Sequence, residues 1–154
     1  MIKELFSAAV GTIAFSLLYG VPRRHYLVCG LIGASGWLMY RLMLSIGISL
    51  SFSVFLAAVL IVFLSRFAAV RRQCPGTVFL ITGIFPLVPG GQFYWASYYL
   101  VTNQLGDAMA SGFAALKVML AIVLGIIFVF EIPHSFFHRI ASRRSHFQGY
   151  RKKT

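Results

Sequence analysis

The chain has 154 residues, of which 59% are apolar and 11% are charged, and its formal net charge is +11. A soluble domain carries about 25% charged residues, so this composition cannot cover a water-facing surface and indicates an integral membrane protein. It excludes soluble enzymes, nucleic-acid-binding modules and secreted disulfide scaffolds. Because one membrane span needs about 20 residues, the length allows about four to six helices.

Apolar segments separated by polar connectors predict an all-α integral membrane protein with about five transmembrane helices, the fourth of them broken. We expect these helices to form one bundle over residues 1–133, followed by a basic tail over residues 134–154. The predicted spans cover about residues 5–20, 26–46, 50–70, 78–103 and 108–132.

The second predicted span contains a row of glycines, Gly30, Gly33 and Gly36, at three-residue spacing. The fifth span begins with a similar group of small residues that includes Ala110 and Ala114. Small residues let two helix backbones approach closely in lipid. We therefore expect tight helix packing at these positions, and a dedicated dimer interface is not needed to explain them.

The fourth predicted span is interrupted by Pro86 and Pro89, which are followed directly by Gly90 and Gly91. Two prolines and paired glycines cannot continue a regular ladder of helical hydrogen bonds. Backbone groups that are freed at membrane depth must be buried in protein or must line a water-filled cavity. The break begins about eight residues into the span, roughly 12 Å at helical rise, which places it near the midplane.

This break is a candidate substrate site, because many secondary transporters hold their substrate where half-helices meet near the midplane. A second half-helix that starts near Pro89 to Gly91 would direct free N–H groups and a positive dipole end at an anion such as a carboxylate. Gln92 would add a hydrogen-bond donor and an acceptor. The alternative is a structural kink that packs against neighbouring helices without a ligand.

Two further side chains are candidates for substrate binding. Tyr94 lies one turn beyond the glycines and faces either the cavity or the aromatic belt of the outer surface. Lys117 lies about nine residues into the fifth span, where a charge costs about 3 kcal/mol. It is either a counter-charge for a substrate carboxylate or a proton-coupling partner, or its stem snorkels to the outer interface. Arg41 is closer to that interface, and we expect it to snorkel.

The acidic residues are candidates for proton coupling. Asp107 lies near the start of the fifth span and either caps that helix or takes part in a proton relay. Glu131, at the inner end of the span, either belongs to a polar boundary or carries a proton. Three acidic residues are too few for a di-metal site, and Cys29 and Cys74 lack the spacing of a metal or disulfide motif. We expect no metal and no cofactor.

The basic residues mark the cytoplasmic side. Eleven of the fourteen Lys and Arg residues lie in the tail or near the two connectors that follow the first and third spans. The positive-inside rule therefore places the tail in the cytoplasm and, with five spans, the N-terminus outside the cell membrane. The tail mixes aromatic and basic residues, which indicates an amphipathic stretch lying on anionic lipid. We expect no nucleic-acid partner.

The run TVFLITGIFPLVPGG, from Thr77 to Gly91, resembles the signature of the threonine/serine exporter family. The whole chain is similar to the short, five-span membrane subunit of the split, two-gene form of that family. The similarity includes Val21-Pro22 with basic residues after the first span, the glycine-rich second span and a basic residue at the end of the third. Only the proline–glycine motif is distinctive, and the family usually has a small residue such as Ser where Gly91 stands.

The resemblance implies a secondary transporter that exports small amino acids, threonine or serine first, in a proton-driven reaction. It also implies a larger partner subunit with a soluble domain and the complementary spans. Some split pairs are linked to dicarboxylates, so a succinate exporter subunit of the same architecture stays open, as does a membrane scaffold that stabilises a partner without transporting. No arrangement of Ser, His and Asp, of Cys and His, or of paired carboxylates indicates an enzyme.

Overall fold

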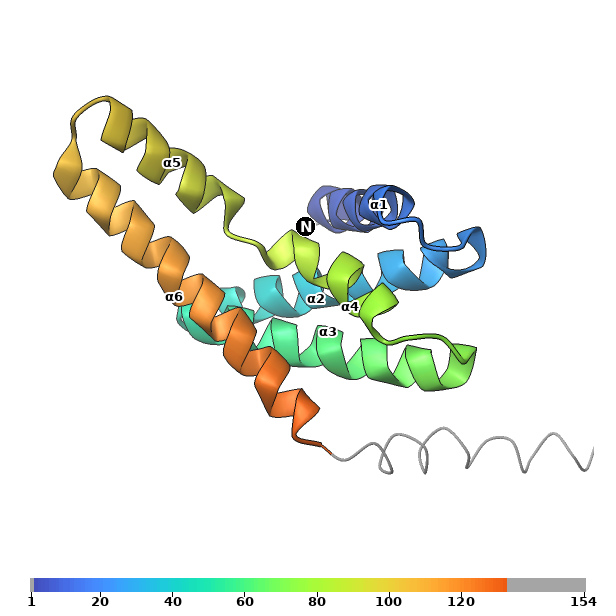
Figure 1. Cartoon of the computed structure of the whole chain (residues 1–154). Coiled ribbons are helices and arrows are strands. Elements are labelled where there is room, and N and C mark those ends of the chain that lie inside the picture. Colours follow the sequence, from blue (N-terminus) through green and yellow to red (C-terminus); the bar gives the residue numbers. More distant parts are fainter. Residues whose placement is uncertain (1, 133–154) are drawn as a thin grey trace, which may run out of the picture.

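The computed structural model describes residues 2–132, and the regular elements in this range are all helices (Figure 1). The all-α prediction is confirmed. The predicted basic tail and its lipid contact lie outside the described residues. In chain order the elements are α1 (Ile2–Leu18), η1 (Arg23–His25), α2 (Tyr26–Ser45), α3 (Leu50–Arg72), α4 (Thr77–Ile84), η2 (Phe85–Leu87), α5 (Gly90–Val101) and α6 (Leu105–Phe130).

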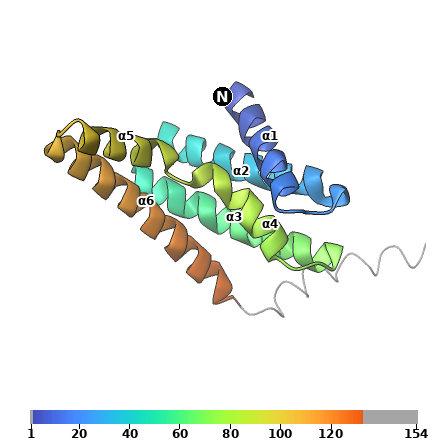
Figure 2. The same ribbon diagram turned by 45° about the horizontal axis from the view of Figure 1, so that its top comes forward.

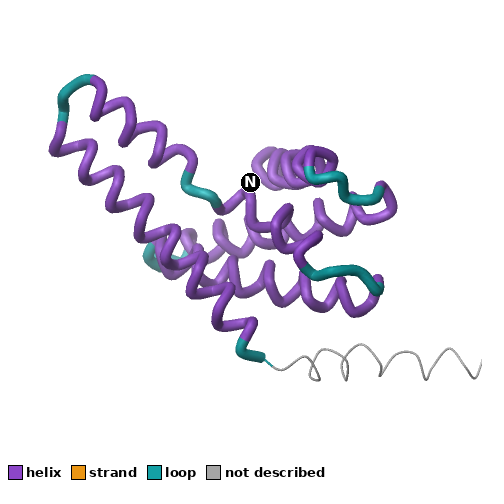
Figure 3. Tube along the Cα trace, in the orientation of Figure 1, coloured by secondary structure: helices purple, strands orange, loops and turns teal. Residues whose placement is uncertain are grey.

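Three helical segments are long and apolar enough to cross a membrane: η1 with α2, α3, and α6. A fourth candidate is a helix in two parts. The first part is α4 with η2, the second is α5, and the two parts meet at an angle of 51° across a short break. Figure 3 shows this break as a short non-helical segment between two purple helices. α1 has 17 residues, slightly fewer than the roughly 20 of a complete span. The protein is therefore a multi-pass membrane protein with three or four candidate spans in its described part.

Residues in the left-handed backbone region follow four of the helices. Gly20 (φ 65°) follows α1, Gly47 (φ 88°) follows α2, Gln73 (φ 51°) is the C-cap of α3, and Asn103 (φ 61°) follows α5. Glycine adopts this region without steric cost, so it ends the first two helices at the connectors. α3 continues through Arg72, two residues beyond the predicted end, because cationic side chains are favourable near a helix C-terminus.

α3 is the central helix of the bundle. It contacts α2 and α6, and α4 lies against both α2 and α3 (Figure 1). α1 crosses α2 at a steep angle, whereas α5 packs chiefly on α6, so that α5 and the first part of α6 project together from the rest (Figure 2). The buried face of α3 consists of small and apolar residues, namely Ser53, Val54, Ala57, Ala58, Ile61, Val62, Ser65 and Ala68.

The glycine row of α2 lies where helices approach most closely. A Cβ atom at Gly33 would overlap the side chain of Thr12 in α1, and a Cβ atom at Gly36 would overlap Ile61 in α3. The predicted tight packing at this row is confirmed. In α6 the closest approach lies further along than predicted, at Gly125, where a Cβ atom would lie 2.8 Å from the Cβ atom of Ala58 and 3.1 Å from a backbone oxygen of α3.

Two arginines tie helices together at opposite ends of the bundle. Arg66 in α3 donates hydrogen bonds to the carbonyl oxygens of Val129 (2.7 Å) and Ile132 (2.9 Å). The Val129 carbonyl also accepts from the N–H of Ile132 (3.2 Å). Both carbonyls lie at the negative end of the α6 dipole, so a cation stabilises them. At the other end, Arg41 Nε lies 2.9 Å from Glu4 Oε2 and joins the end of α2 to the start of α1.

Replacing Gly125 with alanine is expected to destabilise the protein, because the new Cβ atom meets backbone atoms of α3 that cannot move aside. We expect a loss of about 1–3 kcal/mol in the free energy of unfolding, measured on the purified protein in detergent micelles. Gly112→Ala is the matched control in the same helix, since no atom lies within 4 Å of its Cβ position. Equal stability of the two variants would contradict the close contact between α3 and α6.

Candidate functional site

The break between α4 and α5 follows from the positions of its two prolines. α4 ends at Ile84, and Pro86 lies in the single turn of η2, where its missing N–H is tolerated. Val88 is extended (φ −62°, ψ 129°), as expected for a residue that precedes a proline. Pro89 (φ −78°, ψ 56°) then redirects the chain, and α5 begins at Gly90.

The N-terminus of α5 has no side-chain cap. Its N-cap residue is Pro89, which has no side-chain hydrogen-bond group. The N–H of Gly90 donates to the carbonyl of Val88 (2.8 Å), and the N–H of Phe93 donates to that of Pro89 (3.2 Å). Within residues 2–132, the N–H groups of Gly91 and Gln92 have no acceptor. Free N–H groups at the positive end of a helix dipole form a binding place for an anion.

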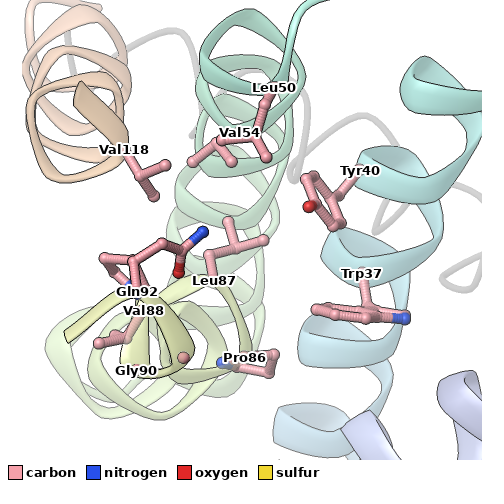
Figure 4. A pocket seen from close by; sticks show the side chains of 12 residues that line it. Trp37, Tyr40, Leu50, Val54, Pro86, Leu87, Val88, Gly90, Gln92 and Val118 are labelled. Atoms are coloured by element: carbon pink, nitrogen blue, oxygen red, sulfur yellow. The ribbon is translucent and has the colours of Figure 1, made fainter. Parts of the chain in front are cut away.

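These N–H groups belong to the wall of a pocket of about 210 Å³ (Figure 4). The side-chain amide of Gln92 and the hydroxyl group of Tyr40 point into the pocket from opposite walls. The pocket is smaller than the roughly 300–1,000 Å³ of sites for drug-sized ligands, and none of its lining residues is charged. They come from α2 (Trp37, Tyr40), α3 (Leu50, Val54), the break and the start of α5 (Pro86, Leu87, Val88, Pro89, Gly90, Gly91, Gln92) and α6 (Val118).

The structure brings together five of the seven residues that the sequence indicates for substrate binding. These five are Pro86, Pro89, Gly90, Gly91 and Gln92, all of which line the pocket.

Tyr94 and Lys117 do not line the pocket. Tyr94 is 64% exposed, and its ring packs edge-on against Trp95. Two residues correspond to about 200° around a helix, so Tyr94 points away from the side on which Gln92 meets the pocket. Lys117 is exposed on α6 beside Val118, which does line the pocket. The pocket gives no support to the predicted roles of Tyr94 and Lys117, which stay predictions.

The two carboxylates predicted for proton coupling lie at the ends of α6. Asp107 is exposed in the first turn of the helix, whose N-cap is Gln104. The alternative that Asp107 caps this helix is wrong, because α6 begins at Leu105, three residues earlier than predicted. Glu131 is exposed and is the C-cap of α6. Neither residue lines the pocket, and their proton-coupling roles stay predictions. Within the described range, no three His, Cys, Asp or Glu side chains group closely enough to hold a metal ion.

The walls that α2, α3 and α6 contribute were missed by the sequence reasoning. Trp37 and Tyr40 carry a signal that could have indicated them, because two amphipathic aromatic residues three positions apart share one face of a helix. Their ring centres are 5.3 Å apart. Leu50, Val54 and Val118 carry no such signal, since apolar residues are ordinary in a membrane helix and only the tertiary packing brings these three to the pocket.

Comparison with known proteins gives one family. A family model described as "Threonine/Serine exporter, ThrE" matches residues 4–132. The match includes α1 from its third residue, every later element through α6, and every residue that lines the pocket. No solved structure matches the chain.

The glycines of the break are expected to be dispensable for stability. No atom lies within 4 Å of the Cβ position of Gly91, so Gly91→Ala introduces no clash and removes backbone freedom from the unfolded chain. We expect the free energy of unfolding to stay the same or to rise by up to about 1 kcal/mol, measured by thermal unfolding in detergent micelles. A loss of stability of similar size would favour the alternative of a structural kink.

Proposed function

The chain belongs to the threonine/serine exporter family, and from this premise we propose that it is a membrane subunit through which threonine and serine leave the cell. The proteins of this family are exporter-type membrane transport proteins and not a class of enzymes. The observation that carries the proposal is the pocket at the break between α4 and α5, because it combines free backbone N–H groups with two polar side chains.

The carboxylate of the amino acid binds at the N-terminus of α5. There the N–H groups of Gly91 and Gln92 are free, and the absence of side chains at Gly90 and Gly91 lets a ligand reach the backbone. The amide of Gln92 and the hydroxyl group of Tyr40 provide hydrogen bonds for the ammonium and hydroxyl groups of threonine or serine. The apolar side chains of α3 and α6 surround the methyl group of threonine.

The charge of the pocket favours an amino acid over a dicarboxylate such as succinate. One helix N-terminus offers the equivalent of about half a positive charge, which suits one carboxylate. A second carboxylate would need a further cation, and none of the lining residues is Lys, Arg or His. A zwitterionic amino acid has no net charge and therefore needs no such counter-charge inside the apolar bundle.

The proposal includes five crossings, formed by α1, α2, α3, the α4–α5 pair and α6. Support comes from the way basic residues gather at one end of the bundle. Arg72 at the end of α3 donates to the carbonyl of Arg24 in η1, just before α2 (3.4 Å), and Arg66 binds the end of α6. By the positive-inside rule this end is cytoplasmic. The start of α1, which Arg41 holds through Glu4, then lies at the outer surface of the cell membrane.

A larger partner subunit, with a soluble domain and complementary spans, completes the transporter in this proposal. α5 supports it, because none of its residues is buried and it packs chiefly on α6. Its free face leaves room for a span of the partner beside the pocket. Tyr94 and Lys117 would contact that span or its substrate, and Asp107 and Glu131 would exchange protons at the two surfaces. Anionic lipid would bind the basic tail.

Blocking the pocket is expected to abolish export. Cells loaded with a threonine-containing dipeptide release threonine, and we expect Gly91→Leu to reduce this efflux by about tenfold or more, because the new side chain occupies the substrate space at a cost of roughly 1–3 kcal/mol. Gly106→Leu is the matched control. Gly106 is the second residue of α6, as Gly91 is of α5, and no atom lies within 4 Å of either Cβ position.

The same assay, with the variants at matched expression levels, distinguishes the amino-acid exporter from the dicarboxylate exporter and from the membrane scaffold. A strain without this chain is expected to retain threonine and to release succinate normally. Retention of succinate instead of threonine would show that the exported substrate is a dicarboxylate and not an amino acid. Normal threonine efflux in Gly91→Leu, together with loss of the partner subunit from membranes that lack this chain, would favour the scaffold.

Removing one hydroxyl group from the pocket is expected to weaken export without blocking it. Tyr40→Phe deletes a single hydrogen bond to the substrate, and we expect threonine efflux at low internal threonine to fall by about 2- to 10-fold. The control is Tyr98→Phe in α5, which removes a hydroxyl group from an exposed side chain away from the pocket. An equal effect of the two substitutions would show that the Tyr40 hydroxyl group does not contact the substrate.

A further inference from the structure

A histidine is buried at the end of the bundle that lies away from the pocket. His25, the last residue of η1, is 2% exposed. Tyr40 in the pocket wall lies fifteen residues further along the chain, about 22 Å at helical rise. The ring of His25 packs edge-on against Phe79, at 5.5 Å between ring centres and 90° between planes. Phe79 is fully buried in α4, the first half of the broken helix.

The hydrogen bond at the ring of His25 fits the neutral form of this residue. The Nε2 atom accepts a hydrogen bond from Nε of Arg24 at 3.0 Å, so this nitrogen carries a lone pair and the ring proton is on Nδ1. The Nδ1 atom is buried and has no hydrogen-bond partner among the described residues. His25 is thus a buried titratable group with one nitrogen bound to a cation and the other without a partner.

The charges that act on His25 are both positive. They are the guanidinium groups of Arg24, in the same turn, and of Arg72, at the end of α3. The thiols of Cys29 and Cys74 belong to the apolar cluster that contains Phe79. Burial raises the pKa of the Cys74 thiol, so this group provides no negative charge near neutral pH.

The carboxylates of the chain are engaged or placed elsewhere. Glu4 pairs with Arg41 at the opposite end of the bundle, and Asp107 and Glu131 are exposed at the two ends of α6. His25 is therefore the one buried side chain in the described range that ordinarily titrates between about pH 5 and pH 8.

A proton on this ring is incompatible with the observed packing. It must bind the lone pair of Nε2, which turns this atom from an acceptor into a donor and breaks the hydrogen bond from Arg24. The result is an imidazolium ion in an apolar site beside two guanidinium groups, where desolvation and like charge both oppose it. The ring relieves both by moving into water, and that movement separates it from Phe79.

We propose that His25 is the residue through which this chain couples proton uptake from the cytoplasm to the opening of its inner end. One proton from cytoplasmic water binds Nε2, the imidazolium ring leaves its site, and α4 loses the contact that holds Phe79 in place. Release of the proton returns the neutral ring and closes this end. The assignment of this end to the cytoplasm and the consequence for export rest on the proposed function, whereas the opening itself does not.

Cys29 provides a reporter for the opening that requires no transport. It is fully buried in α2, one turn after His25, and the chain has only two cysteines. In the Cys74→Ser background, an impermeant methanethiosulfonate is added to inside-out membrane vesicles, and the rate of Cys29 labelling is measured at about pH 5 and about pH 8. Because thiolate content changes with pH in the same way in each variant, every rate is divided by that of His25→Gln.

We expect the wild-type labelling rate, divided by that of His25→Gln, to be near one at the higher pH. At the lower pH we expect it to rise by about tenfold, because histidine can be protonated and glutamine cannot. Phe79→Leu is the matched control. It loosens the same contact but keeps the titrating group, so its labelling is faster at both pH values and keeps the pH-dependent ratio. A ratio that does not change with pH would overturn the proposal. If His25→Gln unfolds in a thermal assay, His25→Phe takes its place, because it keeps a ring against Phe79.

Threonine efflux measured in parallel distinguishes the two proposals. If the proposed export is wrong, wild-type cells release no threonine through this chain, yet Cys29 labelling still depends on pH. If the role of His25 is wrong, efflux is present, and its dependence on cytoplasmic pH is the same in wild type and in His25→Gln. Support for the opening requires that the wild-type labelling rate, divided by that of His25→Gln, rises at the lower pH. Support for its consequence requires in addition that His25→Gln loses the dependence of efflux on cytoplasmic pH.

Discussion

The structure depends on one constraint, which is that backbone N–H and C=O groups inside a membrane need partners within the protein. Regular helices meet this requirement over most of the bundle. Pro86 and Pro89 prevent it at one place, and the chain compensates with the single turn of η2 and a bond from Gly90 to Val88. The N–H groups of Gly91 and Gln92 stay free and line a pocket. The other helices hold this gap open, since the close packing of α2 and α6 on α3 sets where the walls of the pocket lie.

Charge is distributed so that the interior stays neutral. Arg41 and Glu4 pair at one end, while Arg66 compensates the dipole of α6 at the other. Between these ends, the residues that line the pocket have no charged side chain. A zwitterionic ligand matches such an interior, because it brings equal and opposite charges and exposes neither to lipid. Protonation of His25 would be the exception, as it would place a net positive charge within the packed end of the bundle that contains Phe79.

The sequence predicted the features that depend on local chemistry and missed those that depend on contacts between distant residues. Composition and the succession of apolar segments were enough for the all-α membrane class, and the glycine row of α2 was enough for close packing. Gln92 was identified because it follows the glycines directly, whereas Tyr94 points the other way around the same helix. The partner of Arg41 lies 37 positions away in α1, and the burial of His25 is concealed by the arginines before it, which make its connector look like an exposed basic loop.

Because the N-terminus of α5 has no cap, a bound ligand and this helix would stabilise each other. This helix has 12 residues, none of them buried, and its first turn lacks an acceptor for two N–H groups. Short helices are marginal without tertiary support, and a capping group contributes about 1 kcal/mol. A carboxylate that occupies this position is then the N-cap of the helix. In the proposed transport cycle the bound molecule would complete the fold, so order in this half-helix and occupancy of the pocket would rise and fall together, and each departure would leave a less ordered helix.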